Sequence, residues 1–527
     1  MIQSPAVVVC IGALTLALVV LRKATKTSHD PREPPLAPQS IPLIGHIIGL
    51  ARRNFEYYVD LSHQTDAPIF TVSLPGQKMY VIAKPDLIRA AQKQHRILAF
   101  PPISAKFSTK ICGSSPHAQT VIDASVFSDE GDSGIWVDIH DAMHAALRPG
   151  APLDDMNRDM LKRITEALDE LEHSSANAPQ TWHLNAWLKD AVTTATTRSV
   201  YGPRSPFEDK AVVDAFWEFE KGLMLILVGI LPSITARKAT AARDKVGRAF
   251  LRYFQSDALE TASAYAKNRY HAGIKNKITL EDLSRFEVGG SLAVLVNTVP
   301  ASFWTLVLFY AHPGLLDKLR EEADACTDTK TVGGTTTKVL DMATLKASCP
   351  LLLSAYQEVL RYRSMGMSVR EVVEDTYLDQ WLLKKGTMLQ MPSRVIHQDA
   401  SLWGESVGEF NPRRFLAEEK GNRPSDICFR AFGGGKTLCP GRHFATNEVL
   451  AIVALFISRF EMKPVAGGWD LPTAANTNAA AVIMEPDNDI EVEITPREGF
   501  GNVKWAVNLE KSDRVFAMVT EDTDKTG

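Results

Sequence analysis

Apolar residues recur at helical spacing over most of the chain. The pattern predicts helices at residues 156–171, 184–200, 212–227, 244–270, 288–311, 313–326, 351–362 and 440–460. Apolar and polar residues alternate, as is typical of strands, at 72–82 and 490–495, and one or two more short strands are expected within 381–391. The glycine-containing stretch 333–337 is expected to be a loop. The sequence therefore predicts a mainly α fold with small β-sheets (α+β).

The chain opens with a stretch that has no charged side chain. Residues 5–21 are dense in Val, Leu, Ile and Ala, and Arg22 and Lys23 follow at once. This run is barely long enough to cross a hydrocarbon core about 30 Å thick. A cleaved secretory signal, the alternative, would carry its basic residues before the apolar run. We therefore expect residues 1–23 to be a transmembrane helix that leaves the rest of the chain in the cytosol.

Prolines dominate the segment that follows. Five of them lie between residues 31 and 42, and proline fixes φ and interrupts helices. The sequence predicts a basic, proline-rich connector over 24–45, a body over 46–510 and a charged tail over 511–527.

One long apolar segment has two interpretations. Residues 288–311 carry no charge, so their length suits a second membrane span. Their middle, however, reads Asn297-Thr298-Val299-Pro300, and polar groups and a proline are costly at that depth in lipid. A helix that is apolar all round can also be the central buried helix of a soluble body. This segment alone leaves both possibilities open.

The net charge of −4 argues against a nucleic-acid partner bound through overall basicity. The six cysteines are scattered, with no C-x-x-C pair, so neither a disulfide framework nor a zinc ribbon is expected.

One cysteine lies in an unusual setting. Residues 432–442 read FGGGKTLCPGR, and the predicted helix 440–460 follows directly. Three successive glycines let backbone approach a ligand closely, and Pro440 suits a first helical turn. The sulfur of Cys439 is therefore expected among outward-pointing N–H groups that favour the thiolate. A nucleophilic cysteine is the alternative, with His443 as the local candidate for its base.

This segment resembles the heme-binding pattern FxxGxxxCxG of the cytochrome P-450 family, here Phe432, Gly435, Cys439 and Gly441. The resemblance implies a heme-thiolate catalytic domain that binds heme b, with Cys439 as the axial ligand to the iron. One position departs from the family pattern. Two residues before the cysteine, Thr437 replaces the usual Arg or His that binds a heme propionate, and Arg370 is our candidate for that contact.

Two further motifs occur in the order of the same family. Glu358 and Arg361 form an E-x-x-R in which the two side chains share a helix face. The segment 410–415, FNPRRF, resembles the family motif whose arginine completes a Glu–Arg–Arg network, and by match that arginine is Arg414. The resemblance implies that these three residues support the heme pocket structurally.

The long apolar helix resembles the central helix of the family, which crosses the distal face of the heme. The position of the usual threonine falls on Asn297, preceded by Val296 where the family has an acidic residue. The usual acid–alcohol pair is therefore missing. Asn297 and Thr298 are our catalytic candidates, since both can hydrogen-bond an oxygen ligand. A helix-packing amide is the alternative for Asn297.

The stretch NTVPASFW resembles the branch that contains sterol 7α-hydroxylases and prostacyclin synthase. The resemblance implies a monooxygenase of the endoplasmic reticulum membrane that takes electrons from an NADPH–cytochrome P-450 reductase and oxidises an apolar small molecule. A heme-thiolate isomerase or dehydratase that needs no reductase, and a non-catalytic heme sensor or carrier, are the alternatives. We expect the apolar stretch 223–231 to touch lipid, with an ordinary buried helix end as the alternative. Lys436, Arg442 and His443 are candidates for a basic docking surface for the reductase, with a solvated face as the equal alternative.

Overall fold

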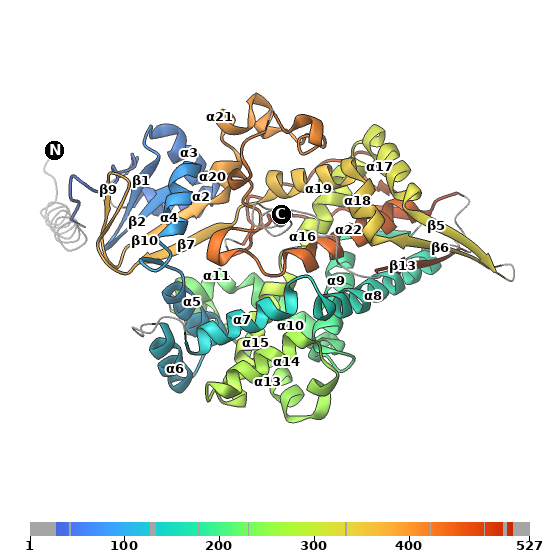
Figure 1. Cartoon of the computed structure of the whole chain (residues 1–527), viewed down its shortest axis with the longest axis horizontal. Coiled ribbons are helices and arrows are strands. Elements are labelled where there is room, and N and C mark those ends of the chain that lie inside the picture. Colours follow the sequence, from blue (N-terminus) through green and yellow to red (C-terminus); the bar gives the residue numbers. More distant parts are fainter. Residues whose placement is uncertain are drawn as a thin grey trace, which may run out of the picture.

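The computed structural model describes residues 28–41, 44–126, 133–175, 180–229, 231–332, 335–421, 423–478, 480–498 and 503–509. The predicted anchor 1–23 and the predicted tail 511–527 lie outside these residues. In Figure 1 the largest sheet and the first helices occupy one end of the molecule, and helices fill most of the rest. The prediction of a mainly α fold with small sheets is confirmed.

A bundle of helices forms the centre of the molecule. The predicted helix 288–311 consists of α15 (Leu280–Leu295) and α16 (Thr298–Tyr310), which are separated by a break at Val296 and Asn297. α16 packs against α9 (Leu184–Tyr201), α19 (Pro350–Arg363) and α22 (Arg442–Arg459), and α22 also contacts α8 (Ala151–Ser175). Every residue of α16 is buried. By length and composition the combined helix passes as a membrane span, but its burial among other helices makes it a core element.

The main sheet has five strands in the order β1-β2-β10-β7-β3. These strands are β1 (Ile69–Leu74), β2 (Gln77–Ile82), β10 (Met388–Pro392), β7 (Met367–Val372) and β3 (Leu98–Ala99). The predicted strand 72–82 is therefore a hairpin. It turns at Pro75, which has no N–H to donate to a ladder, and at Gly76, whose φ of 74° suits glycine.

Smaller sheets lie elsewhere. They comprise β11 (Phe460–Pro464), β12 (Glu491–Pro496) and β4 (Gln180–His183); β13 (Lys504–Asn508), β6 (Thr335–Asp341) and β5 (Thr327–Val332); and β8 (Thr376–Leu378) with β9 (Trp381–Leu383). The prediction of a loop at 333–337 is wrong for residues 335–337. These threonines begin β6, which pairs with β5 and β13, and β-branched side chains favour such a position.

Two predicted helices are interrupted. The prediction 212–227 corresponds to α10 (Lys210–Lys221) and α11 (Leu223–Val228), separated at Gly222, whose missing side chain leaves room for Ala239. The prediction 244–270 corresponds to α13 (Arg237–Gln255) and α14 (Ala264–Lys275). The hydroxyl of Ser263 accepts from the N–H of Ala266 and so starts the second helix.

The remaining helices lie around the central bundle and the main sheet. They are α2 (Gly45–Arg53), α3 (Glu56–Gln64), α4 (Pro85–Lys93), α5 (Pro101–Phe107), α6 (Pro116–Val126), α7 (Ile135–Leu147), α12 (Pro232–Thr235), α17 (Pro313–Ala325), α18 (Met342–Ser348), α20 (Ser393–His397) and α21 (Ala400–Trp403).

The described part of the proline-rich connector is attached to the main sheet. Thr71 in β1 donates its N–H to the carbonyl of Pro35 at 2.8 Å and accepts from the N–H of Ala37 at 2.8 Å. The Thr71 hydroxyl also donates to the carbonyl of Pro34 at 2.6 Å. These residues thus extend the sheet at its edge, which is a position where proline is tolerated.

Candidate active site

The cysteine loop closes on itself before α22 begins. The N–H of Cys439 donates to the carbonyl of Phe432 at 2.9 Å, and the turn requires positive φ at Gly433 (78°) and Gly435 (60°). The helix begins at Arg442 with Gly441 as its N-cap, so Pro440 lies just before the first turn instead of within it. The sulfur is therefore held three residues ahead of the helix.

The glycines of this loop do different things. Gly433 and Gly441 line the cavity that contains the sulfur, but Gly435 does not. A Cβ on Gly434 or Gly435 would instead meet the side chain of Gln92, at 2.8 and 3.2 Å respectively. These two glycines therefore allow α4 to pack against the outside of the loop.

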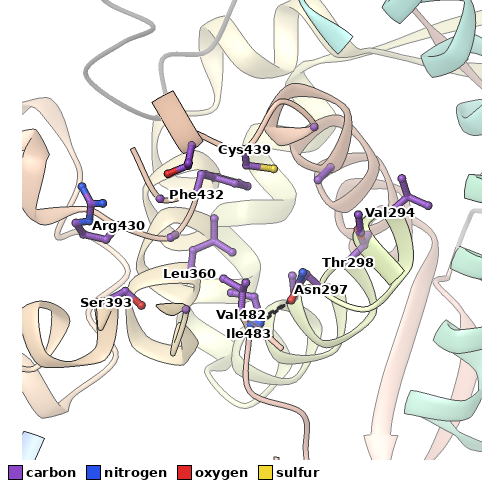
Figure 2. A pocket seen from close by; sticks show the side chains of 18 of the residues that line it. Val294, Asn297, Thr298, Leu360, Ser393, Arg430, Phe432, Cys439, Val482 and Ile483 are labelled. Carbon is purple, nitrogen blue, oxygen red and sulfur yellow. Dashed lines mark hydrogen bonds between the residues drawn. The ribbon is translucent and has the colours of Figure 1, made fainter. Parts of the chain in front are cut away.

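The sulfur of Cys439 opens into a cavity of about 300 Å³, within the range of cofactor and small-molecule sites. Figure 2 shows Cys439 on one side of this cavity and Asn297, Val482 and Ile483 on the other. Burial raises the pKa of the Cys439 thiol, while the N–H groups of Gly441 and Arg442 and the charge of Arg442 lower it. The expected N–H donors are thus present, but desolvation outweighs them.

Asn297 and Thr298 lie where the central helix is broken. Pro300 lacks the N–H that would bond to the carbonyl of Val296, so the helix opens at this turn. The Oδ1 atom of Asn297 accepts a hydrogen bond from the N–H of Val482 at 2.8 Å and one from Ile483 at 3.4 Å. Both Asn297 and Thr298 line the cavity. The amide therefore packs against the C-terminal loop and also faces the cavity.

Arg370, in β7, lies in the wall of the same cavity and is 5% exposed. Its guanidinium donates to the carbonyl of Val369 at 2.8 Å and to the hydroxyl of Thr437 at 2.6 Å. Burial, with the nearby charge of Arg430, lowers its pKa to about 10. In the described part of the chain it has no carboxylate partner, so this cation is suited to an acidic group in the cavity.

Glu358, Arg361 and Arg414 meet away from the cavity. Arg361 donates to both carboxylate oxygens of Glu358 at 2.8 Å, and the Nε atom of Arg414 lies 3.1 Å from each of them. Glu358 and Arg361 are fully buried. The two arginines also donate to the carbonyls of His397 and Trp403, which ties α19 to the segment before the cysteine loop. Tyr356 and Leu360, on the same helix, line the cavity.

Arg442, expected on a docking surface, is instead buried and donates to the carbonyl of Cys439 at 3.1 Å. Only the neighbouring Lys436 is exposed, and His443 is partly buried. The sequence analysis also missed Val482, Ile483 and Arg430 in the cavity wall. None of them stands in a recognisable pattern, and the first two come from an irregular loop.

The sequence profile of the family described as Cytochrome P450 matches residues 34–492. The chain belongs to the cytochrome P450 family. It is 35% identical to "Cytochrome P450 monooxygenase nodJ" of Hypoxylon pulicicidum over 96% of this chain and 98% of that protein. It is 23% identical to "Cholesterol 7-alpha-monooxygenase" of Cricetulus griseus over 87% of this chain and 92% of that enzyme. The expected likeness to sterol 7α-hydroxylases is therefore confirmed.

A solved structure shows the same fold. Cyanobacterial CYP120A1 bound to retinoic acid matches with a TM-score of 0.67 at 18% identity, covering 88% of this chain and 100% of that chain. This P450 is thus an oxidoreductase of the monooxygenase type, and its cofactor is heme b.

The residues of the cavity are suited to heme b. The Cys439 sulfur in the wall is the one thiol among the residues that line the described cavity, as an axial ligand requires. Phe432, Leu360 and Val449 supply apolar surface for a porphyrin, and the buried guanidinium of Arg370 is suited to a propionate.

Proposed function

We propose that this P450 inserts one oxygen atom of O2 into an apolar small molecule, such as a sterol or terpenoid, with electrons from a separate NADPH–cytochrome P450 reductase. The observation that carries this proposal is the opposition of a cysteine sulfur and two polar side chains, Asn297 and Thr298, across one cavity. The heme supplies the oxygen chemistry when it is bound, and its thiolate ligand favours cleavage of the O–O bond.

The residues of this chain then have distinct parts. Cys439 holds the iron, and Arg370 holds a propionate and so fixes the orientation of the cofactor. The Nδ2 group of Asn297 makes no hydrogen bond within the described residues, since only its Oδ1 atom is engaged, so it is available to an oxygen atom in the cavity. Ala293, Val294 and Ala301 give the substrate side an apolar surface that excludes water.

The membrane part of the proposal rests on an apolar surface at α11 and α12. On and after α11, the exposed large apolar residues are Leu225, Val228, Leu231 and Ile234, whereas Leu223 and Ile226 are buried. Leu227, within the stretch expected to touch lipid, is only partly exposed. With the predicted single-pass anchor, this surface supports a placement of the body against the cytosolic face of the endoplasmic reticulum membrane.

The decisive experiment is the difference spectrum of the reduced protein with carbon monoxide. The wild type should give the thiolate-ligated signal and Cys439→Ser should lose it. Cys428→Ser, another buried cysteine eleven positions earlier, is the matched control and should keep it. A protein that binds no heme, or a thiolate signal that survives in Cys439→Ser, would refute the proposal.

A second measurement separates a monooxygenase from an isomerase. With reductase, NADPH and a substrate found by type I spectral shifts, a monooxygenase consumes oxygen and NADPH in step with product. An isomerase forms product from a peroxide substrate in the absence of NADPH.

A further inference from the structure

A second cavity adjoins the one that contains the cysteine sulfur. It has a volume of about 350 Å³ and shares Phe100, Tyr265 and Ala293 with the first cavity. Its walls come mainly from α5, α7, α14, α15 and the short π-helix η1 (Ser108–Cys112), and most of its surface is apolar. The sulfur lines only the first cavity, so a ligand that fills both cavities has one end in the second, away from the sulfur.

The second cavity is lined by a single cation. Arg269, on α14, is the one arginine, lysine or carboxylate among the described residues of its wall, and it is 8% exposed. Its Nε atom donates to Oε1 of Glu287, on α15, at 2.9 Å. Its Nη1 atom donates to the sulfur of Met143 at 3.2 Å, and a thioether is a weak acceptor. The Nη2 atom makes no hydrogen bond within the described residues, so this buried guanidinium has a donor left for a ligand.

Gly290 leaves this donor uncovered. It lies on α15 and lines the same cavity, and a Cβ added to it would lie 3.0 Å from Nη2 of Arg269. Glycine is unfavourable in the interior of a helix, whereas any side chain at this position would cover the nitrogen. The missing side chain therefore keeps Nη2 open to the cavity.

The charge of Arg269 is already neutralised. Both carboxylate oxygens of Glu287 are engaged, since Oε2 accepts from the phenol of Tyr201 at 3.1 Å. Burial lowers the pKa of Arg269, but the adjacent carboxylate raises that pKa by more, so the guanidinium stays charged. A carboxylate on a ligand would be a third buried charge without a counterion, which is unfavourable. A hydroxyl or carbonyl oxygen accepts from Nη2 without adding a charge.

We propose that Arg269 binds a neutral oxygen atom of the substrate, a hydroxyl or a carbonyl, at the end of the molecule remote from the carbon that is oxidised. The inference rests on the proposed function. Gly290 precedes Asn297 by seven residues, which is roughly 10 Å along a helix. The substrate is therefore a sterol or terpenoid with an apolar skeleton of several rings that spans both cavities and carries an oxygen at one end.

The test is a titration of the heme-loaded protein, followed by type I spectral shifts, with two matched pairs of ligands. Abietadienol and abietadiene share a terpenoid skeleton, and cholesterol and cholestene share a sterol skeleton. The two members of each pair differ only in one hydroxyl group. The quantity compared between proteins is the dissociation constant of the hydrocarbon divided by that of the alcohol. A loosened pocket weakens both members alike, so this ratio reports the contact to the oxygen and not the packing of the cavity.

Two variants remove the donor in different ways. Gly290→Ala places a methyl group against Nη2 and keeps every charge, and it should lower the ratio of at least one pair by roughly 10- to 100-fold, the range of one charge-assisted hydrogen bond. Arg269→Met combined with Glu287→Gln removes both charges together and should lower the ratio to the same extent. Gly247→Ala is the matched control. An added Cβ at this helical glycine on α13 would lie 3.8 Å from Val288, an ordinary contact, so the ratio should stay as in the wild type.

The outcomes separate this inference from the proposed function. A ratio that is unchanged in Gly290→Ala, or that falls equally in Gly247→Ala, overturns the role of Arg269. If the double variant does not bind heme, Gly290→Ala decides alone. Abietate is the carboxylate of the same terpenoid skeleton, and tighter binding of abietate than of abietadienol overturns the assignment of a neutral oxygen. No spectral shift with either alcohol overturns the substrate class. Absence of the thiolate-ligated carbon monoxide complex in the wild type overturns the proposed function instead.

Discussion

Asn297 Oδ1 accepts the backbone N–H of Val482 at 2.8 Å, which joins the central helix to a loop 185 residues later in the chain. The break at Val296 brings the amide far enough out of the helix to reach that loop. The two interpretations that the sequence left open for Asn297 are thus compatible. One end of the amide holds the loop, and the other end faces the cavity.

Removal of this amide should loosen the loop. We expect Asn297→Ala to lower the free energy of unfolding by about 1–3 kcal/mol, because the partly buried N–H of Val482 loses its acceptor. Ser302→Ala is the control, since that buried hydroxyl on α16 has no hydrogen-bond partner in the described structure. Chemical denaturation of the heme-loaded protein measures both variants, and equal losses would contradict the prediction.

Two adjacent arginines should behave very differently. Arg414 is buried on Glu358, whereas Arg413 is exposed and pairs with Glu418 at the surface. We expect Arg414→Leu to cost about 3–5 kcal/mol and much of the bound heme, because it leaves a buried charge network incomplete. Arg413→Leu should cost about 1 kcal/mol at most. Heme content and denaturation midpoints measure both, and a similar loss in the two variants would argue against a supporting network.

Arg370 should stabilise the heme-loaded protein but not the heme-free protein. In Arg370→Leu we expect heme to leave for a heme-scavenging protein roughly tenfold faster. The heme-free form of this variant should be as stable as the wild type or more so, since an uncompensated buried cation has been removed. Arg370→Lys, which keeps the charge, is the control. If Arg370→Leu lowers the stability of the heme-loaded and heme-free protein equally, the role of Arg370 is packing and not propionate binding.

The buried carboxyl of Glu448, on α22, should make the stability of the protein depend on pH. Its pKa is about 8 in the folded protein against an ordinary value of 4.5. As the pH rises, the unfolded chain therefore releases this proton before the folded protein does. Between these two pKa values, the contribution of Glu448 to the free energy of unfolding falls with increasing pH. Glu448→Gln cannot titrate, so its stability relative to the wild type should rise from pH 5 to pH 8 and then level off. A pH-independent difference in denaturation would contradict the raised pKa.

The surface at Leu225 and Val228 should bind lipid. In a form that lacks residues 1–27, we expect Leu225→Ser with Val228→Ser to reduce pelleting with phospholipid vesicles severalfold, because less apolar area enters the membrane. Val465→Ser, an equally exposed apolar residue beyond β11, should pellet like the parent. If the double variant pellets as much as its parent, the surface at Leu225 and Val228 does not bind the membrane.

The sequence predicted those parts of the fold that depend on local pattern. Long helices such as α8, α9 and α22 appeared as apolar periodicity, and the cysteine loop as a motif. The strands β5 and β6 were not foreseen, because their threonines and lysines have no apolar alternation. They are stabilised by pairing with each other and, for β6, with β13. The breaks at Gly222 and before Ser263 depend on packing and capping, which periodicity does not record.

The site was predictable only where a motif marked it. Motifs marked Cys439 and the Glu358 network, and Arg370 was a candidate because Thr437 replaces the usual propionate ligand. Val482 and Glu448 were not predicted. Val482 acts through its backbone N–H, which any residue would supply. Glu448 sits in an apolar helix, where nothing in the local pattern shows that its carboxyl accepts a hydrogen bond from Thr196.

The bonds of Thr71 to Pro35 and Ala37 also limit how the body moves above a bilayer. If the predicted anchor ends near residue 23, about ten residues separate it from the hydrogen bonds to β1, and Glu33 is already paired with Lys78 and Tyr80 of β2. A fully extended segment of this length spans roughly 35 Å. In that placement the edge of β1 would stay close to the headgroups, and the proposed reductase would approach from the sides of the body that are turned toward the cytosol.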